Sequence, residues 1–74
     1  MSEKVLEVQV DFNKPLKEET FQTIYEAIRN LSGVVSLDMA ILEQSFSVLI
    51  ITTDETLDTE QVVRTASEVV AANR

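Results

Sequence analysis

Large apolar residues stand at both odd and even positions along residues 33–53, GVVSLDMAILEQSFSVLIITT. Two apolar, β-branched runs separated by a polar break predict two β-strands joined by a tight turn at residues 43–45. Successive side chains of a strand point to opposite faces of the sheet, so both faces of this hairpin carry apolar side chains. A chain of 74 residues has enough helix to cover one face. We expect the other face to meet a partner.

The remaining segments show strand or helix periodicity. Within residues 4–12, an apolar set (Leu6, Val8, Val10 and Phe12) alternates with a mainly polar one (Val5, Glu7, Gln9 and Asp11). Two longer segments carry apolar residues at helical spacing. The predicted strands and helices, in chain order, are strand 4–12, helix 13–33, strand 34–42, strand 46–53 and helix 56–74.

Local residue chemistry places the ends of both helices. Pro15 suits the first position of the first helix, where its missing N–H costs nothing. Gly33, the only glycine, stands where the helix ends and the backbone needs a positive φ. Asp58 is a good N-cap for the second helix, and Gln61 follows three residues later, as in a capping box.

The order β-α-β-β-α predicts an α+β, ferredoxin-like split βαβ fold. Right-handed crossovers place the first strand beside the third, so the three antiparallel strands take the spatial order 1-3-2. Both helices then pack on one face, and the first strand lies at an edge. We expect one domain spanning residues 1–74.

Two segments resemble the heavy-metal-associated domains of copper chaperones and metal-transporting ATPases. They are LSGVVSLDMAI at residues 31–41 and VLIITTDETLDTEQVVRTA at residues 48–66, and the resemblance extends over residues 5–72. It implies the same ferredoxin-like fold. That family binds metal through a Met-x-Cys-x-x-Cys loop, whose cysteines would fall near Lys17 and Thr20 here. An ammonium and a hydroxyl do not hold a soft monovalent copper ion, so we expect no metal and no cofactor at this loop. Ligand-binding ACT domains share the element order, but their glycine-containing turn before the first helix is missing.

Composition narrows the functional classes. The chain has no histidine and no cysteine, so the familiar nucleophile–histidine pairs and thiolate metal sites are excluded. The formal net charge is −7, which disfavours direct binding to nucleic acid. No targeting signal and no apolar run long enough to span a membrane is present in the sequence. We therefore expect a cytoplasmic, non-enzymatic protein.

One loop is strongly acidic. The segment TDETLDTE at residues 53–60 holds Asp54, Glu55 and Asp58 close together, which could attract a hard cation weakly. The preferred interpretation is that these carboxylates cap the second helix and complement its dipole.

The two faces of the sheet are assigned by parity. The inward face, which we expect the helices to cover, holds Leu37, Met39, Ile41, Phe46, Val48 and Ile50. The outward face holds Ala40, Leu42, Leu49 and Ile51, and with Val5 and Val35 nearby these residues form the predicted interface. These residues predict a protein-interaction module that forms a homodimer through the open face or the first strand. Two alternatives stay open: an acidic regulator or nucleic-acid mimic that inhibits a basic partner, and a metal- or small-ligand-binding domain related to the heavy-metal-associated family.

Overall fold

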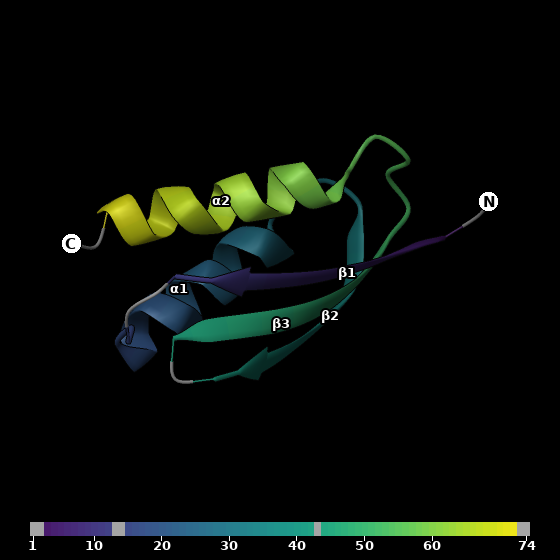
Figure 1. The fold of residues 1–74 in the computed structure, drawn as a ribbon. Helices are drawn as coiled ribbons and strands as arrows, with labels where there is room; N and C mark the ends of the chain where they lie inside the picture. Colours follow the sequence, from purple (N-terminus) through teal and green to yellow (C-terminus); the bar gives the residue numbers. More distant parts are fainter. Residues whose placement is uncertain (1–2, 13–14, 43, 73–74) are drawn as a thin grey trace.

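Three strands and two helices follow one another in the predicted order β-α-β-β-α (Figure 1). The structure, a computed structural model, describes residues 3–12, 15–42 and 44–72. Glu43, within the predicted turn, lies outside the described residues. The elements are β1 (Lys4–Asp11), α1 (Glu18–Arg29), β2 (Val34–Ile41), β3 (Ser45–Thr52) and α2 (Thr59–Ala72).

The sheet has the strand order β1-β3-β2, and β3 runs antiparallel to both neighbours. The predicted α+β, ferredoxin-like fold is thereby confirmed. Because β3 is central, both β1 and β2 are edge strands, whereas the sequence reasoning considered only the first strand as an edge. The β2–β3 register shifts between Val34 and Ser36. Val35 lies at this bulge, where the strict alternation of faces along β2 is interrupted.

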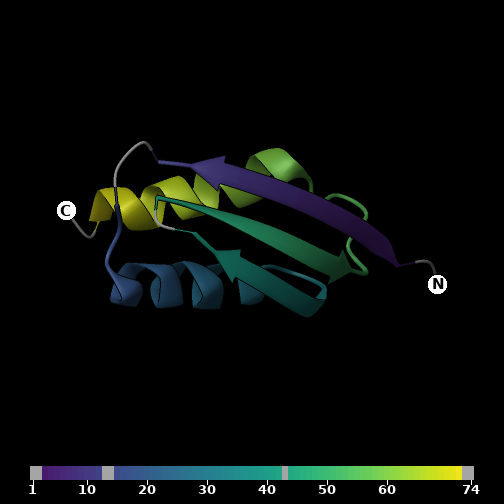
Figure 2. The same ribbon diagram turned by 60° about the horizontal axis from the view of Figure 1, so that its bottom comes forward.

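Both helices lie on one face of the sheet, α2 along β1 and α1 along β2 (Figure 2). The core forms between the helices and this face, where Phe46 is fully buried. The Phe12 and Phe21 rings lie 5.7 and 6.4 Å from the Phe46 ring, centroid to centroid. Such tilted and edge-to-face contacts are the preferred arrangements of aromatic rings. Neither described helix is long and apolar enough to cross a membrane.

The first helix begins at Glu18, three residues after Pro15, the predicted first helical position, and later than the start of the predicted range 13–33. Lys17 precedes it with an extended backbone, and its carbonyl accepts hydrogen bonds from the N–H groups of Thr20 and Phe21 at 3.0 and 3.3 Å. Pro15 therefore lies outside the helix. Proline is compatible with a first helical position but does not impose one, whereas Glu18 and Glu19 stabilise the first turn against the helix dipole.

The predicted start of α2 is confirmed, whereas α1 ends at Arg29, four residues before the predicted end at Gly33. Gly33 has φ +78°, the left-handed conformation that glycine adopts without penalty, and it lies in the loop directly before β2. Its carbonyl accepts a 2.9 Å hydrogen bond from the Thr53 N–H, which ties this loop to the residue after β3. At α2, the Gln61 N–H donates to Asp58 Oδ1 at 2.9 Å, and the Asp58 N–H donates to Gln61 Oε1 at 3.1 Å. This is the reciprocal pattern of a capping box.

Candidate functional site

The residues of the predicted interface differ in how far solvent reaches them. Val5, Val35, Leu42 and Leu49 are 62, 60, 55 and 41 % exposed. Ala40 is also exposed, whereas Ile51 is only partly exposed. Ile51 lies between Val5 of β1 and Ser36 of β2 in the sheet register. The surface is therefore apolar in part, as predicted, but its apolar side chains come from different rows of the sheet.

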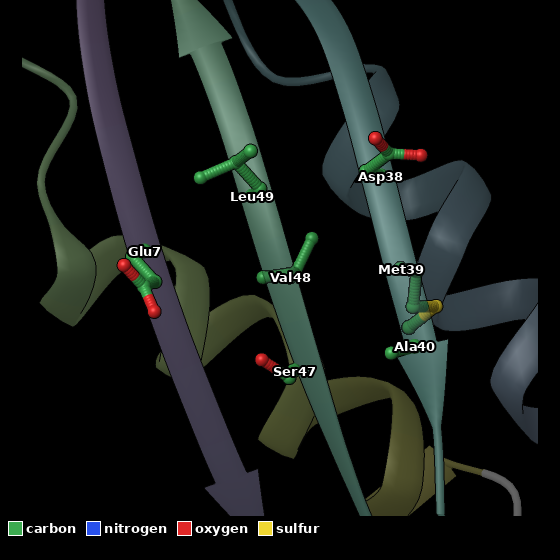
Figure 3. Close-up of a pocket in the computed structure, with 7 residues that line it drawn as sticks. All are labelled: Glu7, Asp38, Met39, Ala40, Ser47, Val48 and Leu49. Atoms are coloured by element: carbon green, nitrogen blue, oxygen red, sulfur yellow. The ribbon is translucent and has the colours of Figure 1, made fainter.

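A shallow hollow of about 390 Å³ lies on this face. Figure 3 shows that residues from all three strands surround it. Small side chains at its centre, such as Ala40 and Ser47, account for the depression between larger neighbours. Its lining consists of Glu7, Asp38, Met39, Ala40, Ser47, Val48 and Leu49.

Charge on the open face is entirely acidic. Leu49 stands directly between two carboxylates, because Glu7 of β1 and Asp38 of β2 are both its cross-strand partners. Within the three strands, whose residues are all described, the only cation is Lys4. Its Nζ donates hydrogen bonds to the carbonyl oxygens of Glu55 and Leu57, at 3.3 and 2.9 Å, and so binds the β3–α2 loop rather than the carboxylates of the open face. The face combines an apolar centre with negative flanks.

The two edges of the sheet differ in how well the helices cover them. The helix-facing side chains of β1 are at most 8 % exposed: Leu6, Val8 and Val10. On β2, Leu37 and Met39 are only partly buried, and Ile41 is 52 % exposed. The prediction that the helices cover Ile41 is wrong, because α1 does not enclose the last helix-facing position of β2.

A groove of about 510 Å³ lies where α1 and β2 leave this gap. Sequence reasoning missed it, because parity tells which face a side chain is on but not how far a helix extends sideways over that face. The one available signal is Tyr25, which lies one helical turn after Phe21 and therefore on the same side of α1. The groove is lined by Phe21, Gln22, Tyr25, Glu26, Arg29, Met39 and Ile41.

The acidic loop is organised by its own hydrogen bonds. Asp54 Oδ1 accepts from the hydroxyl and the N–H of Thr56, at 2.6 and 2.9 Å. Hydrogen bonding, first from the Thr56 side chain and then from its backbone, holds the pKa of Asp54 below its usual value. Asp58 caps α2. Over the described part of the chain, no three His, Cys, Asp or Glu residues form a group that could hold a metal ion. The geometry thus favours capping over cation binding at Asp54, Glu55 and Asp58.

Comparison with protein-family models, curated proteins and solved structures finds no match for this chain. The resemblance to heavy-metal-associated domains therefore stays a prediction. At the positions that correspond to that family's cysteines, Lys17 is exposed and Thr20 is buried.

Proposed function

We propose that this protein is a non-enzymatic interaction domain that works by associating with a second copy of itself. The observation that carries the proposal is the exposure of large apolar side chains where α1 and α2 leave the sheet uncovered. Exposed apolar surface that exceeds scattered single side chains usually marks a contact with another protein. Here it lies partly on the open face and partly at the β2 edge. The residues in question are Val5, Val35, Ile41, Leu42 and Leu49.

The two edge strands support the same proposal. In the part of the chain that the structure describes, β1 and β2 each pair only with β3. An edge strand presents backbone N–H and C=O groups that can pair with a strand of another chain. Addition of a strand at such an edge is a recurrent mode of protein association. Self-association can thus use the open face, an edge, or both.

The residue content argues against catalysis. Without histidine or cysteine, the chain lacks the commonest general base and the strongest side-chain nucleophile. The hollow on the open face brings two carboxylates, Glu7 and Asp38, to either side of Leu49. An apolar centre with polar flanks is compatible with a contact surface.

The test is the concentration dependence of the molar mass in solution. Light scattering coupled to size exclusion should give a mass that rises from one chain toward two as the protein concentration increases from about 1 to about 500 μM, a range that spans typical weak dimers. Ser67→Ala, at an exposed position of α2, keeps the net charge, serves as the control and should leave the curve unchanged. The mass of a single chain throughout this range would refute self-association. It would turn attention to the alternative of an acidic regulator that binds a basic partner.

A further inference from the structure

We propose that two copies pair through β2, antiparallel, with Met39 opposite Met39 of the second copy, so that two three-stranded sheets join into one continuous sheet. The proposal rests on the self-association proposed above and names the strand and the register that produce it. It assigns the contact to the edge that sequence reasoning did not consider.

The first argument is the direction of the backbone groups of β2. The Leu42 N–H donates to the Ser45 carbonyl at 2.8 Å across the β2–β3 turn. Residues of an antiparallel pair exchange hydrogen bonds at every second position. In the observed register, Ala40 and Asp38 therefore bond to β3. The alternate residues, Leu37, Met39 and Ile41, direct their N–H and C=O groups to the free edge.

The second argument is the groove between α1 and β2. Leu37, Met39 and Ile41 face the helices, opposite Ile50, Val48 and Phe46, yet Ile41 is 52 % exposed. A second copy of β2 at this edge would place the same three side chains beside them, in the groove of about 510 Å³. The β1 edge offers no equivalent, since its helix-facing side chains are already buried under α2. Only β2 gains both backbone hydrogen bonds and buried apolar area.

The third argument is charge, which selects the register. With Met39 opposite Met39, Leu37 faces Ile41 of the second copy, and Asp38 faces Ala40. The smallest slip that keeps the same side chains toward the helices is two residues. In one direction it sets Asp38 opposite Asp38, where like charges repel. In the other direction it leaves Leu37 opposite a position beyond the end of β2.

Charge also favours a second copy at this edge over one stacked on the open face. The rim of the groove carries one acid and one base, Glu26 and Arg29, so two copies of this rim are not mutually repulsive. On the open face, Glu7 and Asp38 flank Leu49, and a stacked copy would bring two more carboxylates. A continuous sheet keeps the acidic faces in water.

The absence of cysteine allows an unambiguous cross-linking test. In the proposed register residues 38 and 40 form a non-hydrogen-bonded pair across the two copies, with Cα atoms about 4.5 Å apart, within disulfide range. The single variants Asp38→Cys and Ala40→Cys, both at exposed positions, are mixed and oxidised. We expect mainly the mixed disulfide dimer. Self-linked Ala40→Cys as the main product, or the absence of any mixed dimer, would overturn the register.

Second-site variants test the edge itself. Ile41→Lys in both cysteine variants should abolish the mixed dimer, because it places a charge in the groove, while Leu49→Lys on the open face should leave it intact. Circular dichroism checks that each variant is folded. Pairing through β2 is wrong, although self-association stands, if the unmodified protein dimerises but the cysteine variants give no cross-link. The same holds if Leu49→Lys rather than Ile41→Lys abolishes dimerisation. A protein that is monomeric at all concentrations refutes both proposals.

Discussion

At Gly33 both the backbone conformation and the neighbouring atoms favour a residue without a side chain. A Cβ at this position would lie 2.8 Å from both the Cβ and the N of Asp54, closer than such atoms approach, and φ is +78°. We expect Gly33→Ala to lower the free energy of unfolding by about 1–3 kcal/mol, measured by urea denaturation, from backbone strain and the displaced β3–α2 loop. Gly33→Asn separates the two causes, because asparagine tolerates positive φ but meets the same contact. A loss within about 0.5 kcal/mol of zero for alanine would show that the loop yields freely.

At the level of single elements, α2 depends on its N-terminal cap. Asp58 and Gln61 satisfy each other's backbone N–H groups, and Leu57 and Val62 on either side of the cap belong to the core. Asp58→Ala should lower the free energy of unfolding by about 1 kcal/mol, because an N–H in the first turn loses its acceptor. Asp58→Asn keeps an acceptor oxygen and should retain most of the stability in the same urea titration. If asparagine proves as damaging as alanine, the negative charge at the helix dipole matters more than the hydrogen bond.

For the whole molecule, net charge opposes the association of identical copies. Each chain carries a formal charge of −7, so two copies repel at long range. Raising the salt from about 0.1 to about 1 M shortens the screening length from about 10 to about 3 Å. The dimer dissociation constant should therefore fall as salt is added, as sedimentation equilibrium can measure. A dissociation constant that rises instead would show that ion pairs between the copies, such as those available to Glu26 and Arg29, outweigh the repulsion.

The features that sequence could predict are those decided by neighbouring residues. Gly33 marks the turn into β2 and the Asp58–Gln61 pair the start of α2, through backbone chemistry that acts within a few positions, and alternation assigns a face to the strand residues outside the bulge. The start of α1, the bulge after Val34 and the exposure of Ile41 depend on how whole elements pack. The sideways placement of α1 over the sheet, for example, reflects its contact with α2 as well as with β2. The groove follows from that placement and has no signature in the spacing of residues.

The pairing of β1 with β3 has a consequence for biosynthesis. β1 is synthesised before β3, and at about 5–20 residues per second the interval between the completion of the two strands is roughly two to eight seconds. During that interval the strand has neither its partner nor α2 to cover Leu6, Val8 and Val10. Glu7 and Asp11, which alternate with these residues, keep the nascent segment charged and oppose its pairing with other nascent chains. We therefore expect the carboxylates of β1 to oppose aggregation of the chain before the sheet has formed.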